Sequence, residues 1–266
     1  MVYLAEIINE IQEAINELIN AANDASPDGF IAYIAGGDYY REFENTDLLP
    51  YVLEDVSGFR KDLSRQRFYV NYLNKNYKRD GFHYEGRDGI DCLTIELMIY
   101  SHLWQSNYYL KHLVRLAHLA CSREYDWYLM ITSNIRNVIN NEITDPLVKK
   151  GIKLGHIVKD NYYPVLRDSF AHGLYSIDEY DKVIRLYSDR AVGPVSFDVF
   201  QKKFLFSILL SQILFESYRE NQKRMAAFLS DNAKIIALPD GQRIKVEAEV
   251  RSVEGEEFYI FRPVLK

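Results

Sequence analysis

The chain has 266 residues, of which 48% are hydrophobic and 26% are charged, and its net charge is −6. This composition can form a sizeable core and is ordinary for a soluble domain. The acidic balance argues against a large non-specific nucleic-acid surface, although it leaves room for RNA binding at one local site. No apolar run reaches the ~18 residues of a membrane helix, and the acidic beginning of the chain does not resemble a signal peptide. We therefore expect a cytoplasmic protein without a membrane anchor.

The first half of the chain predicts helices separated by turn signals. Apolar side chains at helical spacing predict an amphipathic helix over residues 3–22, which ends before the turn sequence AANDASPDG. Residues 51–77 also have a helical pattern, with Gly58 as a candidate break. The glycine-rich segment 79–89 has no apolar periodicity, so it is the best candidate boundary in this half.

From Ile90 onward the apolar positions become dense. Further helices are predicted over residues 90–121, 122–142 and 144–156. A break at 105–107 would divide the first of these into two, Ser122 would cap the second, and Pro146 suits the first turn of the third.

The second half predicts a motif helix, a hairpin, a long helix and a strand-rich tail. Gly173 ends the motif helix, and a β-hairpin follows with its turn at residues 178–181. Residues 197–229 form a long helix, and 234–263 form a small β-meander. The predicted fold is mainly α, a helical bundle with a short hairpin and a C-terminal β-meander. The predicted domains are a helical region over 1–88, a helical domain over 89–230 and a β appendage over 231–266.

The segment YYPVLRDSFAHGLYSID, residues 162–178, is the most informative part of the sequence. It places Arg167 and Asp168 five and four residues ahead of His172, on a helix predicted to start near Asn161. An arginine binds phosphate, and an imidazole moves a proton near neutral pH. The two groups together are what phosphodiester chemistry without a metal requires.

Helix geometry divides this motif between two faces. On an ideal helix Arg167 and His172 point about 140° apart, with small residues between them. Asp168 lies one turn before His172, so its carboxylate can orient the imidazole and favour the charged ring. An Arg–His site would therefore form most easily between two copies of this helix, which predicts a homodimer.

The segment from Arg167 to His172 and the phrase LRDSFAHGLYSID resemble the HEPN superfamily, whose signature is an R-x4–6-H motif with a polar residue after the arginine. The phrase looks much like the RNxxAHG segment of bacterial members, except that Asp168 stands where asparagine is commoner. The similarity covers about residues 90–230 and is specific around the motif.

This resemblance implies a helical bundle, a dimer with facing motifs and, in many members, metal-independent RNA cleavage that leaves a 2′,3′-cyclic phosphate. His172 and Arg167 would then act on the 2′-hydroxyl and the phosphate. Many bacterial members are toxins or act in phage defence, so RNA is the candidate substrate and an antitoxin or regulatory protein a candidate partner. No cofactor and no metal are expected. Other members only bind nucleotides or partners, and a non-catalytic module that binds RNA, a nucleotide or a protein is the alternative, with a purely structural bundle as a third interpretation.

Three residues near the motif are candidates for substrate contact. Tyr163 and Tyr175 flank it and could stack on RNA bases, although packing around the helix is the commoner use of tyrosine. Ser169 falls on the predicted core face, where a buried hydroxyl is the simpler interpretation.

Simpler roles also exist for the motif and for other polar residues. Arg167 could pair with Asp160 or Asp168, and His172 could bond a carbonyl at the helix end. A second set of residues could suggest a metal, although helical spacing does not bring its histidines together: His112, His118, Cys121 and Glu124. Cys92 and Cys121 have no CxxC spacing and are expected to be reduced core residues.

Overall fold

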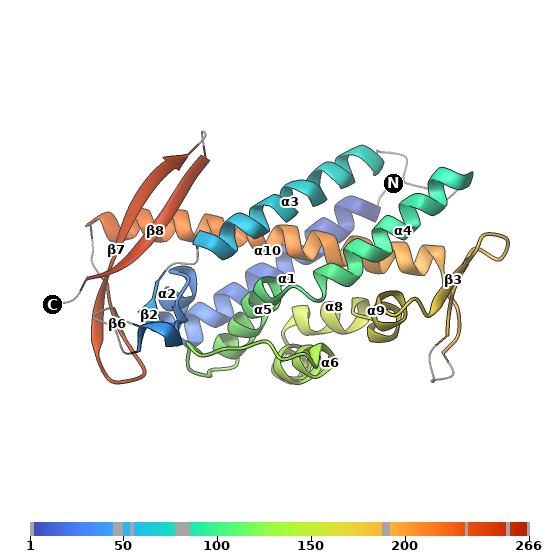
Figure 1. The fold of residues 1–266 in the computed structure, drawn as a ribbon. Coiled ribbons are helices and arrows are strands. Elements are labelled where there is room, and N and C mark those ends of the chain that lie inside the picture. The colour runs from blue at the N-terminus through green and yellow to red at the C-terminus, as the bar shows by residue number, and fades with distance from the viewer. Residues whose placement is uncertain are drawn as a thin grey trace.

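The computed structural model describes residues 3–44, 50–53, 56–77, 86–187, 192–231, 234–253 and 256–264. The chain is mainly helical, which confirms the predicted fold class. Its helices form an elongated bundle with a small three-stranded antiparallel sheet near each end (Figure 1). The two-stranded sheet of β1 (Asp38–Tyr39) and β2 (Tyr51–Val52) lies at the same end as β6 (Lys234–Ala237). Within the described ranges no helix combines the length and the apolar character needed to cross a membrane.

The N-terminal helix belongs to the central bundle. α1 (Tyr3–Ala25) confirms the predicted amphipathic helix and packs against α5 (Asn107–Ala120), α8 (Lys153–Asn161) and α10 (Phe197–Asp231). Its buried face carries a row of aliphatic side chains that includes Ile11, Ile15 and Leu18. One continuous hydrophobic core extends from α1 into the C-terminal sheet. The division into the domains 1–88, 89–230 and 231–266 stays a prediction.

The predicted long helix α10 runs along the bundle from one sheet to the other (Figure 1). Phe200 and Phe204 of α10 are fully buried. The indole of Trp104, which follows α4 (Gly86–Leu103), is also fully buried, and its Nε1–H donates to Ser207 Oγ of α10 at 3.1 Å. Because Trp104 follows α4 whereas both phenylalanines belong to α10, burying them together removes apolar surface of two segments from water and stabilises their packing.

The segment before α3 differs from the predicted helix at residues 51–77. α2 (Pro27–Ile34) leads to β1 (Asp38–Tyr39) and the short helix η1 (Arg41–Phe43), and β1 pairs with β2 (Tyr51–Val52). α3 (Val56–Asn76) then runs through Gly58 without a break. Residues 79–85 of the polar boundary predicted at 79–89 lie outside the described residues, and α4 (Gly86–Leu103) begins in the remaining part. The predicted break at 105–107 is confirmed, since Ser106 caps α5 by accepting from the Tyr109 N–H at 3.4 Å.

The helix predicted from Ser122 to residue 142 is wrong over its first half. Ser122 has a φ of 61°, and the chain continues without a helix until Asn134 caps α6 (Ile135–Asn137). Trp127 is buried in this stretch, with its ring centroid 5.5 Å from that of Tyr51. The indole therefore anchors an irregular segment to the core, a tertiary contact that local periodicity does not contain.

A wide π-helical turn, η2 (Val138–Thr144), joins α6 to α7 (Asp145–Lys150). Pro146 has no N–H to donate, so an α-helix would lose a bond at that position. In the π-helical turn each N–H bonds the carbonyl five residues earlier, and the Asp145 N–H donates to the Asn140 carbonyl in this way. Gly151, with a φ of 78°, then ends α7, so the helix predicted over 144–156 is two helices.

Both predicted β regions are confirmed. β3 (Tyr175–Asp178) and β4 (Val183–Leu186) form the hairpin, and β5 (Val195–Ser196) adds a third strand to β4. The C-terminal meander has its strands in the order β6-β7-β8, over Lys234–Ala237, Arg243–Val253 and Glu256–Val264.

His112 of α5 is half-buried, with its imidazole in a cage of aromatic rings. Its Nδ1 lies 3.0 Å from the Tyr33 hydroxyl, and the rings of Tyr108 and Tyr218 each lie 4.5 Å from the imidazole. Burial, together with the charges of Arg115 and Lys111, lowers the pKa of His112 to about 3. The folded protein therefore holds this histidine neutral over most of the acidic range.

We expect this histidine to make folding stability fall as the pH falls. Below an unfolded-state pKa of about 6.5, the unfolded chain binds a proton that the folded chain excludes until about pH 3. The free energy of unfolding should lose about 1.4 kcal/mol per pH unit in that window from this group. Urea unfolding at about pH 7 and about pH 5 measures the slope, and His112→Asn should reduce it. Equal slopes in the two proteins would contradict the assignment.

Candidate functional site

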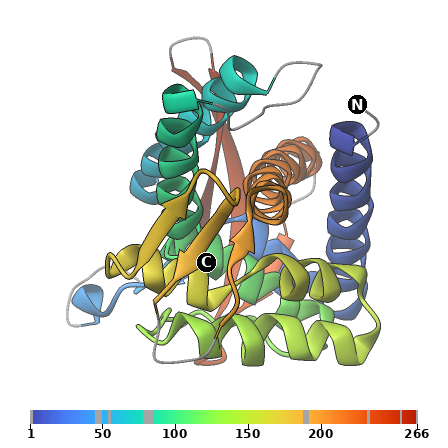
Figure 2. The same cartoon turned by 90° about the vertical axis from the view of Figure 1, so that its right-hand side faces the viewer.

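The motif helix α9 (Pro164–Ala171) lies at the end of the bundle that carries β3, β4 and β5 (Figure 2). It starts at Pro164 rather than near Asn161, because proline favours an extended preceding residue and suits the first helical position. Tyr163 has the expected extended backbone, with φ −119° and ψ 94°. The chain therefore turns between α8 and α9 just before the motif.

A buried tyrosine fixes this turn. The Tyr100 hydroxyl of α4 donates to the Asn161 carbonyl at 2.8 Å and accepts from the Tyr163 N–H at 2.7 Å. One side chain thus satisfies backbone groups on both sides of the junction, and Tyr100 itself is fully buried. The start of the motif helix is held against α4 by these two bonds.

The end of α9 is closed as predicted. Gly173 has a φ of 67°, its N–H donates to Phe170, and the Leu174 N–H donates to the Ser169 carbonyl at 2.7 Å. This pair of bonds is the Schellman arrangement, which uses a glycine in the left-handed conformation to stop a helix. His172 therefore caps the C-terminal end of α9, and the chain continues from Gly173 into the hairpin.

Arg167 is mostly buried and is paired with its neighbour. Its side chain is 12% exposed, its Nε donates to Asp168 Oδ1 at 2.9 Å, and Nη2 contacts the same oxygen. Nη1 is buried and has no acceptor among the residues that the structure describes. Burial raises the pKa of Tyr162 to about 12, and the nearby Arg167 charge opposes that rise. The guanidinium thus lies between an exposed carboxylate and buried tyrosines.

His172 is exposed, and its backbone N–H donates to the Asp168 carbonyl at 3.1 Å. Its imidazole has no partner in the described part of this chain. The Asp168 carboxylate binds Arg167 instead of orienting His172, so the contact predicted from their i, i+4 spacing is absent from these described residues. The ion pair with Asp168 that the sequence left open for Arg167 is present.

The three residues predicted to contact substrate are packed to different degrees. Ser169 is 1% exposed, which matches a buried hydroxyl, and its Oγ has no partner among the described residues. Tyr175 is half-buried with its ring 5.3 Å from Phe170 of α9. Tyr163 is half-buried, and Lys203 Nζ lies 5.8 Å from its ring. The sequence pattern did not predict that the cation of Lys203 lies beside the motif helix.

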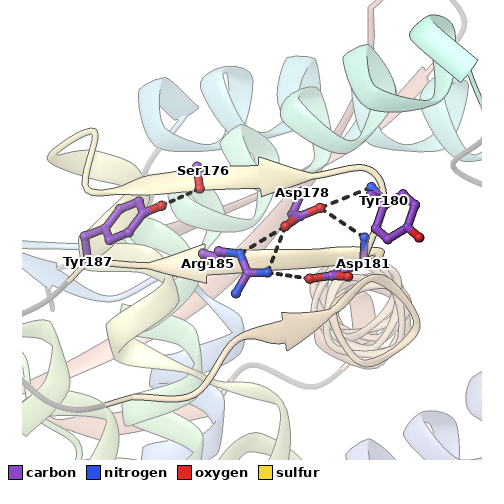
Figure 3. A network of polar contacts seen from close by, with 6 residues as sticks. All are labelled: Ser176, Asp178, Tyr180, Asp181, Arg185 and Tyr187. Carbon is purple, nitrogen blue, oxygen red and sulfur yellow. Dashed lines mark hydrogen bonds and ion pairs between the residues drawn. The ribbon is translucent and has the colours of Figure 1, made fainter.

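The hairpin beside α9 is stiffened by a polar network that the sequence did not predict (Figure 3). Arg185 of β4 donates to Asp178 Oδ2 at 3.1 and 2.8 Å and also contacts Asp181. Asp178 Oδ1 accepts from the Tyr180 and Asp181 N–H groups at 3.1 and 3.0 Å. The Asp181 N–H and Arg185 hold the pKa of Asp178 below its usual value. These bonds fix the turn that follows the motif.

The four residues that could suggest a metal in the sequence, His112, His118, Cys121 and Glu124, do not form a metal site in the described structure. His112 lies in its aromatic cage, whereas His118 Nε2 is 2.8 Å from Glu142. No group of three histidine, cysteine or acidic side chains suited to a metal occurs in the described part of the chain. Cys92 and Cys121 are both half-buried free thiols.

Compared with known proteins, the chain matches no family model, no curated protein and no solved structure. The likeness to the HEPN superfamily therefore rests on the residues of the motif and its surroundings.

Proposed function

We propose that this chain is a HEPN-type, metal-independent endoribonuclease whose Arg–His site is completed by a second subunit. The observation that carries the proposal is the exposure of His172 at the C-terminal end of α9, on the helix that holds Arg167. An exposed imidazole in that position can exchange a proton with a bound substrate.

In the proposed reaction the RNA 2′-hydroxyl attacks the adjacent phosphorus, the 5′-oxygen leaves, and a 2′,3′-cyclic phosphate forms. His172 moves the proton of the 2′-hydroxyl to the departing 5′-oxygen, and Arg167 stabilises the charge that develops on the phosphorane oxygens. Asp168 holds the guanidinium through Nε and Nη2. A bound phosphate would compete for that edge of Arg167, and Asp168 is 51% exposed, so its side chain has room to turn toward solvent.

A second copy of the chain supplies the other half of the site. Within one chain the imidazole of His172 makes no contact with Arg167, as far as the described residues go. The segment after the motif also presents exposed apolar side chains, with Leu174 at 45%, Tyr180 at 95% and Tyr187 at 57% exposure. Exposed apolar groups beside an incomplete site support a homodimer through this end of the bundle.

By its resemblance to bacterial relatives, the protein would act in the cytoplasm as a toxin or in phage defence. An antitoxin or another regulatory protein would then restrain it. These roles rest on the resemblance of the motif.

One observation favours the second candidate function, a non-catalytic module that binds RNA, a nucleotide or a protein. Arg167 is largely buried and already neutralised by Asp168, which would suit a structural ion pair. Cleavage chemistry distinguishes the two functions, since a binding module leaves the RNA intact.

The test is RNA cleavage in the presence of excess chelator. We expect the wild-type protein to produce fragments that end in 2′,3′-cyclic phosphate, detected by mass spectrometry. Arg167→Ala and His172→Ala should each reduce these products by about 10²-fold or more. Fragments that survive both substitutions, or wild-type protein that leaves every RNA intact, would reject the nuclease and favour the binding module.

A further inference from the structure

A basic cleft lies on elements that carry none of the motif residues. It has a volume of about 590 Å³ and is lined from the end of α5, from η2 and from α7. Its described lining residues are Cys121, Arg123, Asn141, Asp145, Pro146, Lys149 and Lys150. Three cations and one carboxylate thus meet in one cleft, although the whole chain is acidic, with a net charge of −6.

The cations come from two separate segments. Arg123 follows α5, directly after the unusual Ser122 backbone with its φ of 61°, whereas Lys149 and Lys150 are in the last turn of α7. Lysines at a helix end interact favourably with the helix dipole, which explains their place on α7. That effect does not explain why Arg123 converges with them.

Arg123 is held in place by an ion pair with Glu142 at the surface. Its Nη1 donates to Glu142 Oε2 at 2.9 Å, and the same oxygen lies 2.8 Å from His118 Nε2. Although partial burial opposes it, the hydrogen bonds from His118 and Arg123 lower the pKa of Glu142. The carboxylate engages one of the five guanidinium N–H donors, which leaves others for a ligand.

The two lysines have no fixed partner. Neither Lys149 nor Lys150 forms an ion pair with any residue that the structure describes, so both ammonium groups are available. Burial raises the pKa of Cys121, while the charges of Arg123 and Lys150 act against that rise. Arg123 and Lys150 line the same cleft as the Cys121 thiol.

We propose that this cleft binds the phosphate group of a small phosphorylated molecule about the size of a nucleotide. Its volume falls within the 300–1,000 Å³ or so of small-molecule sites. A long polyanion would meet the acidic remainder of the surface, which disfavours RNA as the occupant. No aromatic side chain is among the lining residues described, so the phosphate provides the recognition. π-helical turns such as η2 are frequent at functional sites.

The proposal does not depend on the ribonuclease, because the cleft and the motif share no residue. Isothermal titration of the full chain with inorganic pyrophosphate, and separately with ADP, should detect binding of similar affinity for both. Lys149→Gln with Lys150→Gln should weaken it about tenfold or more, since hydrogen bonds to charged groups are strong. Lys75→Gln with Lys223→Gln removes the same charge from exposed positions and should change affinity by about twofold at most.

Thiol labelling gives an independent measurement on the wild-type protein. Pyrophosphate should slow the alkylation of Cys121, which lines the cleft, and leave that of Cys92 on α4 unchanged, as followed by peptide mass. The proposal is overturned by absence of pyrophosphate binding, by binding of an RNA oligonucleotide alone, or by equal losses in the two double variants. Unaltered labelling of Cys121 at saturating pyrophosphate would overturn it as well.

Discussion

Replacing His172 by alanine should lower the rate of RNA cleavage by about 10²–10⁴-fold, the contribution typical of a positioned acid or base. Arg167→Ala should lose about 10²–10³-fold, as expected when a donor to a developing negative charge is removed. Both rates are measured in excess chelator on one fluorescent RNA. Because His172 is exposed, its replacement should leave the free energy of unfolding almost unchanged.

Mixing the two inactive variants tests where each half of the site comes from. In a dimer that joins Arg167→Ala to His172→Ala, one site keeps an intact arginine and an intact histidine from different subunits. Random exchange makes half of the dimers mixed, each with one working site of two, so about a quarter of the wild-type activity should return. Co-expression followed by the same cleavage assay measures this recovery.

The doubly substituted chain is the matched control. A mixture of Arg167→Ala/His172→Ala with wild type carries the same substitutions in total but places both on one subunit. Its mixed dimers then have no complete composite site, so only the quarter of dimers that are wild type on both subunits stay active, whereas sites within one subunit would leave about half of the activity. If mixing the single variants restores no activity while each forms dimers, both residues act within one subunit. The composite site would then be wrong even if the nuclease were right.

Most elements could be predicted because their signals are local. The apolar stripe of α1, the glycine after His172 and the alternation in β3 and β4 each determine a structure within a few residues. The motif helix ends where Gly173 requires it. The helix begins at Pro164 and not near Asn161 as predicted, because proline restricts the backbone of Tyr163 to an extended conformation.

One failure involves a contact between residues far apart in sequence, and another involves a choice between two nearby partners. Burial of Trp127 against Tyr51 holds an irregular chain where helical periodicity predicted a helix. In the sequence, Asp168 could contact either Arg167 or His172. The i, i+4 spacing was the reason to predict the contact with His172. In the structure the adjacent guanidinium provides a charged donor at 2.9 Å, and Asp168 binds that instead. Charge-assisted bonds are the stronger ones, which explains the choice.

Trp104→Ala should lower the free energy of unfolding by about 3–5 kcal/mol, the range for truncating a buried tryptophan. The indole is fully buried and joins three elements. It donates to Ser207 of α10, and its ring lies 5.1 Å from that of Tyr162, just before the motif helix. The substitution should therefore loosen the support of α9 as well as the core. Urea unfolding followed by circular dichroism measures the loss.

Two variants separate packing from the loss of a hydrogen bond. Trp104→Phe keeps an aromatic ring but removes the N–H, and Ser207 Oγ still donates to the Lys203 carbonyl, so about 1 kcal/mol plus a smaller cavity term should be lost. Tyr180→Ala changes a side chain that is 95% exposed and should stay within about 0.5 kcal/mol of wild type. If Trp104→Ala cost no more than Tyr180→Ala, Trp104 would not join α10 to the α8–α9 junction, and the support of the motif helix would have to come from Tyr100 alone.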